Sequence, residues 1–162
     1  MSEPQRPGPP PLRPFGLVLH HDARWSHDGQ PILHRRLREH FDRSVRFLPD
    51  EGEEGKYVVT LGHFRGEIEV EECGFFVRAF DAESGCILLS DQSEEALDPA
   101  GIRLSSIDGA LICRVKAELR PGGLPARFLQ SAHAELLLHV EEGPDGFMLR
   151  LRGTPHAFDL QD

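Results

Sequence analysis

The chain has 162 residues, of which 39% are hydrophobic and 28% are charged, and its net charge is −9 at pH 7. This size and composition are typical of a folded protein with an ordinary hydrophobic core, and they exclude a membrane-spanning or intrinsically disordered chain. The longest apolar runs, such as Leu136–Leu138, are far shorter than the roughly 20 residues that cross a bilayer. The acidic excess argues against general nucleic-acid binding, because it repels phosphate backbones.

The composition also indicates a cellular setting. The sequence has no asparagine and only two lysines, Lys56 and Lys116, so arginine supplies nearly all the positive charge, a pattern typical of GC-rich bacterial genomes. The three cysteines, Cys73, Cys86 and Cys113, are odd in number and widely spaced, unlike a disulfide framework or a metal knuckle. No apolar signal core opens the sequence. We therefore expect a bacterial cytoplasmic protein with free thiols.

The N-terminal residues 1–14 are rich in proline and have almost no apolar side chains to bury. Such a segment does not repay its ordering entropy, so we expect a disordered or polyproline-like tail. Folded structure is expected to start near Phe15, with strands over residues 15–20 and 24–27.

A helix is expected from about Ile32 to Arg43, with Pro31 near its first position and apolar residues Leu33, Leu37 and Phe41 spaced by four. Further strands are predicted over residues 45–48, 57–61, 67–71, 74–81 and 85–91. In the strand over 67–71, strict alternation places the carboxylates on one face. We interpret this row of like charges as the solvated face of an edge strand.

The second half of the sequence follows a similar order. A strand over residues 110–119 precedes Pro125, which is predicted to open a helix that reaches Val140; an acidic glycine-rich turn and a strand over 147–152 follow. The recurrence of strand, helix, acidic turn and strand indicates an internal duplication. We predict an α+β fold of two structurally related modules, residues 15–80 and 81–162, each a mostly antiparallel sheet packed with one helix.

The segment Arg24–Ile32, with sequence RWSHDGQPI, resembles the bacterial family catalogued as domain of unknown function 1285. Members of that family open with a tryptophan, a histidine, a glycine and a Pro-Ile step into an amphipathic helix. The resemblance extends to about Phe158, with departures at Glu72, Cys73 and Gly74, where the family has an Asp-Ala-Pro step. It implies a fold of two repeated modules and a role in bacterial signalling or small-molecule sensing.

Nine histidines raise the question of a metal site, since His20, His21, Asp22, His27 and His34 supply donors within a short segment. On a strand, however, neighbouring residues point to opposite faces. No metal-ligand spacing such as CxxC or HExxH is present. We therefore predict no bound metal and no other cofactor.

Nucleophilic catalysis requires a thiol or hydroxyl beside a base. The sequence has no GxSxG elbow, and Cys73, in a turn, is the only cysteine expected to be exposed. Its neighbours Glu71 and Glu72 would raise its pKa, which makes it a poor nucleophile. No catalytic residue is therefore predicted, and the sequence favours binding or regulation over catalysis.

The candidate ligand-binding residues are Arg24, Trp25, His27, His34 and Arg35, at the start of the first helix. A helix N-terminus and arginine side chains suit a small anionic ligand, and the indole is either a wall of this site or a core aromatic. The leading hypothesis is a non-catalytic ligand-binding or regulatory protein. The alternatives are a module that binds another protein, such as a signalling protein, through the tail or the acidic strand, and a metal-dependent hydrolase.

Overall fold

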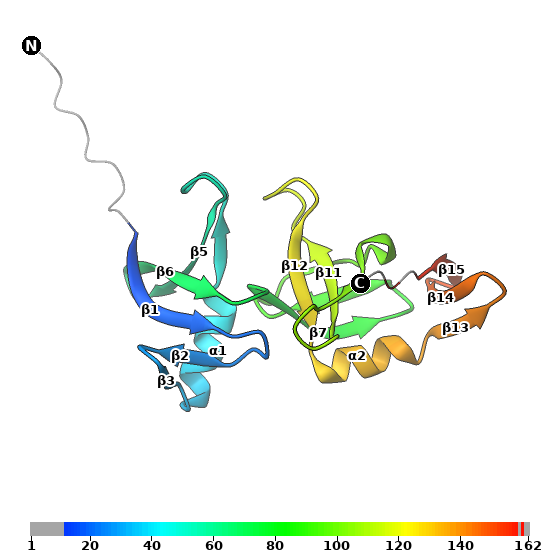
Figure 1. The fold of residues 1–162 in the computed structure, drawn as a ribbon, viewed down its shortest axis with the longest axis horizontal. Coiled ribbons are helices and arrows are strands. Elements are labelled where there is room, and N and C mark those ends of the chain that lie inside the picture. Colours follow the sequence, from blue (N-terminus) through cyan, green and yellow to red (C-terminus); the bar gives the residue numbers. More distant parts are fainter. Residues whose placement is uncertain (1–11, 159, 161–162) are drawn as a thin grey trace, which may run out of the picture.

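The structure is a computed structural model that describes residues 12–158 and 160. The first part of the fold contains β1 (Arg13–Leu19), β2 (Trp25–His27), β3 (Gln30–Pro31), α1 (Arg35–Ser44), β4 (Arg46–Leu48), β5 (Lys56–Leu61) and β6 (Phe64–Val70). Its strands form one mixed sheet in the order β3–β2–β1–β6–β5–β4, and α1 packs against β5 (Figure 1). We call this part the first module.

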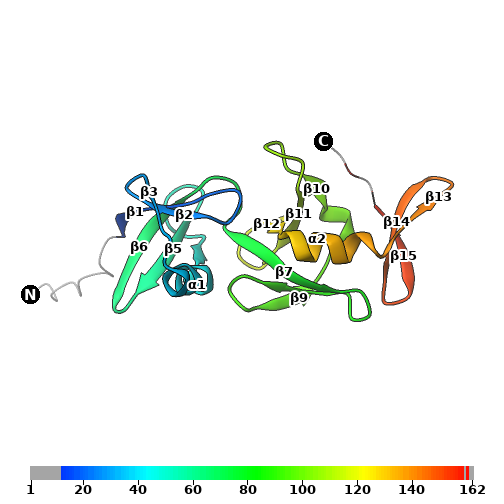
Figure 2. The ribbon, with the colours of Figure 1, turned by 90° about the horizontal axis from the view of Figure 1, so that it is seen from below.

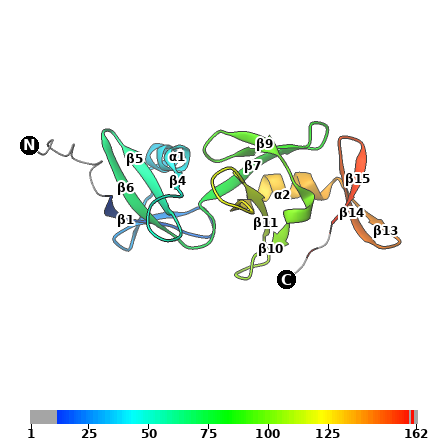
Figure 3. The same cartoon turned by 90° about the horizontal axis from the view of Figure 1, so that it is seen from above.

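The second module contains β7 (Phe75–Asp81), β8 (Cys86–Leu89), β9 (Glu94–Ala96), the short 3-10 helix η1 (Pro99–Gly101), β10 (Arg103–Leu104), β11 (Leu111–Val115), β12 (Leu124–Phe128) and α2 (Gln130–Leu137). Its sheet has the order β10–β11–β12–β7–β8–β9, and α2 packs on β7 and β12. A small third sheet follows, made of β13 (Val140–Gly143), β14 (Gly146–Leu151) and β15 (Thr154–Ala157). It lies at the end of the molecule away from the first module (Figures 1, 2 and 3).

The two six-stranded sheets have the same connectivity. In each, the first and last strands form the central parallel pair, β1 with β6 and β7 with β12, and the remaining neighbours are antiparallel. The prediction of an α+β fold with two related modules is therefore confirmed. The predicted equivalence of the two helices is wrong, because α1 joins the third and fourth strands of its sheet, where the second module has η1, whereas α2 follows the last strand.

The first helix begins later than predicted. Pro31 belongs to β3, opposite Ser26, and the helix starts at Arg35. His34 is its N-cap, because the Leu37 backbone N–H donates a hydrogen bond to His34 Nδ1 at 3.3 Å. A side-chain acceptor at this position satisfies an amide that has no partner within the helix, which fixes the start of the helix after the proline.

The second helix is shorter than predicted, and Pro125 does not open it. Residues 124–128 form β12, in which Leu124, Ala126 and Phe128 are buried while the residues between them are partly exposed. Positions four apart share a face in a strand as well as in a helix, so the apolar spacing of Leu124 and Phe128 is compatible with both. The chain turns helical only at Gln130.

The acidic strand is not an edge strand. β6 lies between β1 and β5 in the interior of its sheet. The predicted alternation is present, since Ile68 is buried and Glu69 is exposed, and Glu67 pairs with Lys56 at 3.2 Å. The carboxylates therefore cover the outer face of a fully paired strand rather than protecting an open edge.

The chain passes from the first sheet to the second between Val70 and Phe75, so the boundary predicted at residue 80 falls inside β7. At the other end, Arg13 and Pro14 already belong to β1. Residues 1–11 of the predicted tail lie outside the described residues.

The two modules share one continuous hydrophobic core. At their junction, the Tyr57 ring lies against Phe75, with ring centroids 6.0 Å apart, and directly over the backbone of Gly74. A Cβ at Gly74 would be 2.2 Å from the Tyr57 ring, so glycine permits this close packing. None of the helices among the described residues has the length and apolar character needed to cross a membrane.

Candidate functional site

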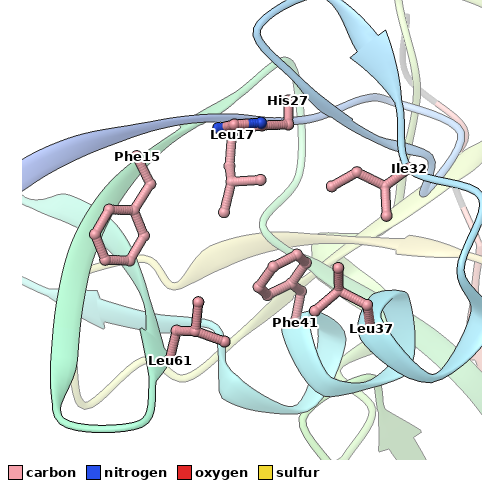
Figure 4. A pocket seen from close by; sticks show the side chains of 7 residues that line it. All are labelled: Phe15, Leu17, His27, Ile32, Leu37, Phe41 and Leu61. Carbon is pink, nitrogen blue, oxygen red and sulfur yellow. The ribbon is translucent and has the colours of Figure 1, made fainter.

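The first module contains an apolar cavity of about 370 Å³. The side chains around it come from β1, β2, α1, β5 and the segment between β3 and α1, and they point toward one another across a common space (Figure 4). The lining residues are Phe15, Leu17, His27, Ile32, Leu37, Phe41 and Leu61.

One wall of the cavity is set by a close contact between β1 and β6. The Phe15 ring lies so near to Gly66 that a Cβ there would be 2.2 Å from it. The register of the parallel pair changes between Pro14 and Val18, which marks an irregularity in β1 at this point. The aromatic wall thus depends on a glycine in the neighbouring strand, and a larger residue there would push the ring toward the cavity.

The floor of the cavity rests on the buried core. Phe41 packs against Trp25, with ring centroids 5.3 Å apart, and Trp25 is only 1% exposed. The indole Nε1–H donates a hydrogen bond to Asp42 Oδ1 at 2.8 Å. Burial raises the pKa of Asp42 above its usual range, while this hydrogen bond and the charges of Arg78 and Arg38 act in the opposite direction. Trp25 is therefore a core aromatic that supports the floor.

The polar group on the cavity wall is the imidazole of His27. Its Nε2 lies 3.4 Å from Asp28 Oδ2, and both side chains are largely exposed. The backbone N–H of Asp28 donates to the Gly16 carbonyl at 3.0 Å. Gly16 has φ of +69°, and a Cβ there would be 2.2 Å from Asp28 Oδ1, so this glycine allows the aspartate to approach β1.

The five predicted site residues do not meet in one place. Of them, His27 lines the apolar cavity, while Arg24 and Trp25 border a separate depression near His20 and His21. The other two serve the helix locally: His34 is its N-cap, and Arg35 pairs with Glu39 at 2.9 Å.

Sequence reasoning missed most of the cavity lining. The spacing of Leu37 and Phe41 predicts only the apolar face of a helix. Phe15 and Leu61 belong to strands that are far apart in the sequence, and neither carries a chemical signal of its own. The pairing of β1 with β6 and of β6 with β5 brings them to the same wall.

A second group of polar side chains joins the two modules. His21 binds Glu71 through its backbone N–H and through Nδ1, both at 3.0 Å, and its Nε2 lies 3.9 Å from Asp108. His20 Nδ1 is 3.5 Å from Glu71 as well. The expectation that His20 and His21 point apart on a strand is wrong, because β1 ends at Leu19. The hydrogen bonds from His21 lower the pKa of Glu71.

Arg127 continues this network on the side of the second module. Its guanidinium makes a bidentate contact with Asp108 and lies 3.5 Å from Glu72. Hydrogen bonding to Arg127 lowers the pKa of Asp108 from 3.8 to about 2. Ser105 Oγ donates to the other oxygen of Glu72 at 2.6 Å. Glu72 thus has a structural role at the junction.

Neither of the two buried cysteines is an activated nucleophile. Cys73 is buried, contrary to the expectation that it is exposed, and Cys113 is buried as well. Burial raises the pKa of each of these two thiols to about 12. Cys86 is partly exposed and is the most accessible of the three.

Within the part of the chain that the structure describes, no three His, Cys, Asp or Glu side chains are grouped in a way that could hold a metal ion. The histidines that prompted the metal hypothesis are used in other contacts. His20 Nε2 is 2.8 Å from Ser26 Oγ, and His21 contacts Glu71.

No protein-family model matches the sequence, and the search of curated proteins gave no match. Two solved structures match this chain. One is a DUF1285 family protein from Silicibacter pomeroyi, with 16% identity and a TM-score of 0.60 over 98% of this chain and 89% of that chain. The other is a DUF1285 family protein from Shewanella baltica, with 12% identity and a TM-score of 0.49 over 77% of this chain and 91% of that chain. The resemblance noted in the sequence is therefore confirmed at the level of the fold, which this chain shares with the DUF1285 family protein from Silicibacter pomeroyi.

Proposed function

We propose that the protein is a non-catalytic binding protein of the bacterial cytoplasm that holds a small carboxylic acid with an aliphatic or aromatic body. The observation that carries this proposal is the cavity of about 370 Å³ in the first module, whose lining is six apolar side chains and one imidazole. Small-molecule sites are typically concave, mostly apolar and roughly 300–1,000 Å³ in volume.

The basic side chains beside the cavity favour an anionic ligand. A second depression, lined in part by Arg13, His63 and Arg65, adjoins the cavity, because Phe15 borders both. Within residues 12–158, Arg13 and Arg65 form no ion pair, in contrast to Arg24 and Arg35. An apolar body in the cavity would thus place a carboxylate near two available guanidinium groups, which bind carboxylates in a fork geometry.

Titration calorimetry with saturated monocarboxylic acids of increasing chain length tests the proposal. Each methylene buried contributes about 0.8 kcal/mol, so affinity should rise about fourfold per carbon until the cavity is full. Alcohols of the same length should bind more weakly, because they carry no charge. Affinity that does not depend on chain length would exclude the cavity as the site.

A matched pair of variants locates the binding. Leu37→Asp places a charge in the cavity wall and should abolish binding of the acids. Leu33→Asp introduces the same change at a side chain that is 79% exposed and is not part of the lining, and it should leave binding unchanged. Unfolding curves of both variants separate lost binding from lost folding.

A regulatory use of this binding is supported by the connection from the cavity floor to the second module. Phe41 packs on Trp25, and Trp25 is hydrogen-bonded to Asp42. The charge of Arg78, in β7, acts on Asp42 across the junction. A ligand that shifts Phe41 would therefore change the surroundings of a carboxyl group that faces the other module.

The second candidate function is binding of another protein. Leu33 and Phe64, both in the first module, are 79% and 72% exposed and are available for contact with a partner. Pull-downs with the full chain and with a chain that lacks residues 1–11 separate the two functions. Loss of a partner without loss of carboxylic acid binding would favour a protein-binding role of the proline-rich segment.

A further inference from the structure

Three arginine residues line a depression in the second module. It has a volume of about 210 Å³ and lies on a different module from the apolar cavity. Its polar lining is dominated by Arg103, Arg114 and Arg120, and the other lining residues are Ile112, Cys113, Pro121, Gly123 and Pro125. We call these three arginines the arginine cluster.

Strand register explains why two of these arginines share a face. Arg103 in β10 lies opposite Ile112 in β11, and Arg114 is two residues beyond Ile112, on the same side of that strand. Leu111, Cys113 and Val115 are buried, whereas Arg114 is exposed. The arginines therefore project from the outer face of the sheet, and Arg120 joins them from the β11–β12 connection.

The guanidinium of Arg114 is held in place by the turn that leads into β12. Its Nη1–H donates a hydrogen bond to the Gly122 carbonyl at 3.0 Å. Gly122 and Gly123 have φ of +84° and +82°, values that favour glycine. A Cβ at Gly123 would lie 3.0 Å from the Val115 carbonyl oxygen and 3.1 Å from Arg114 Cβ. Two glycines thus permit the turn that orients Arg114.

The charges of the arginine cluster are not neutralised within residues 12–158. Within these residues, none of the three arginines forms an ion pair with a carboxylate. Arg127 projects from the adjacent strand and is, by contrast, paired with Asp108 and close to Glu72. The distinguishing feature of the arginine cluster is thus that three such guanidinium groups border one depression.

We infer that the arginine cluster is an anion-binding site for the phosphate group of a small molecule. A carboxylate is matched by a single guanidinium fork, whereas a phosphate monoester carries a charge of about −1.5 to −2 and three acceptor oxygens, enough for several arginines. This site is independent of the carboxylic acid site proposed above.

Titration calorimetry of the full chain at low ionic strength, with inorganic phosphate as the probe and acetate as the comparison, tests this site. Phosphate should bind saturably and more tightly than acetate, and added salt should weaken it. Arg114→Gln should lower phosphate affinity about tenfold or more, because it removes a charged hydrogen-bond donor. Arg114→Lys should also bind less well, since lysine keeps the charge but not the fork.

Arg35→Gln is the matched control, because it removes the same charge from the exposed surface of the first module. It should leave phosphate affinity unchanged, whereas an equal loss in Arg35→Gln and Arg114→Gln would overturn the site. Failure of phosphate to saturate the wild-type chain would do so too. Arg120→Gln, on an exposed turn, provides a second test if Arg114 variants do not fold. Binding of monocarboxylic acids should persist in the Arg114 and Arg120 variants, which separates this inference from the proposed function.

Discussion

The Phe15 ring lies on Gly66, which is so close that a Cβ there would be 2.2 Å from the ring. This contact joins the central parallel strands β1 and β6 and sets the aromatic wall of the apolar cavity. The width of the cavity is thus controlled by a residue that does not line it.

Gly66→Ala should displace the Phe15 ring toward the cavity and reduce monocarboxylic acid affinity. Overpacking of this kind costs about 1–3 kcal/mol of stability. Calorimetry gives the affinity, and urea unfolding gives the free energy of unfolding. The double variant Gly66→Ala with Phe15→Leu should recover part of the lost stability, because a smaller side chain relieves the contact. Equal stability of the double variant and Gly66→Ala would show that the two residues do not interact.

Trp25→Phe should destabilise the fold by about 1–3 kcal/mol, because it removes the indole N–H that donates a hydrogen bond to the partly buried Asp42. The loss should depend on pH. Burial already raises the pKa of Asp42, and losing the indole donor raises it further. When the pKa of a carboxyl group is higher in the folded state than in the unfolded state, the folded state favours the protonated group. The stability that this group contributes is therefore present at low pH and is lost as pH rises through the folded-state pKa.

The cost of Trp25→Phe should therefore be larger at neutral pH than at acidic pH, where Asp42 is protonated. Urea unfolding at both pH values measures this difference. Repeating Trp25→Phe in an Asp42→Asn background, which cannot titrate, provides the control. A pH-dependent cost that persists in that background would assign the effect to another group.

Asp108→Asn should lower stability at neutral pH by roughly 1 kcal/mol or less, because the Arg127 pair is partly exposed. Arg127 lowers the pKa of Asp108 from 3.8 to about 2. A carboxyl group whose pKa is lower in the folded state contributes stability at pH values above its unfolded-state pKa. This contribution is lost as pH falls through the folded-state pKa. The difference between wild type and variant should thus disappear as pH falls from 3.8 to about 2.

Acid unfolding monitored by circular dichroism measures the Asp108 effect. Asp145→Asn is the matched control, since this aspartate lies exposed in the turn between β13 and β14 and belongs to none of the junction contacts. If both variants shift the acid transition equally, net charge explains the shift and the Arg127 pair does not.

The sequence predicts the fold class better than the individual elements, for a physical reason. Alternation and turn residues are local signals, so strands such as β5 and β14 are found within a residue or two. The four-residue spacing of Leu124 and Phe128 fits a strand and a helix equally, and only pairing with β7 and β11 makes this segment a strand. The order of elements predicts a repetition. Which elements of the two modules are equivalent depends on which strands pair, and a single sequence does not contain that information.

The candidate site was harder to predict, because its chemistry is apolar. The charged and aromatic residues at the start of α1 predict a polar site there, yet Arg35 pairs along its own helix and Trp25 is buried. The arginine cluster was missed because Arg103, Arg114 and Arg120 are spread along the sequence and meet only through strand pairing and the β11–β12 turn.

The three cysteines should differ sharply in reactivity toward a thiol reagent in the native protein. Burial raises the pKa of Cys73 and Cys113 to about 12, so these thiols are protonated as well as inaccessible. Cys86 is partly exposed, and its thiol lies 3.8 Å from the Ser84 carbonyl. Native protein should therefore label quickly at one site, and the other two should react only on unfolding. Cys86→Ser should remove the fast phase, while Cys73→Ser should keep it. A fast phase that survives Cys86→Ser would mean that the native fold opens in solution and exposes Cys73 or Cys113.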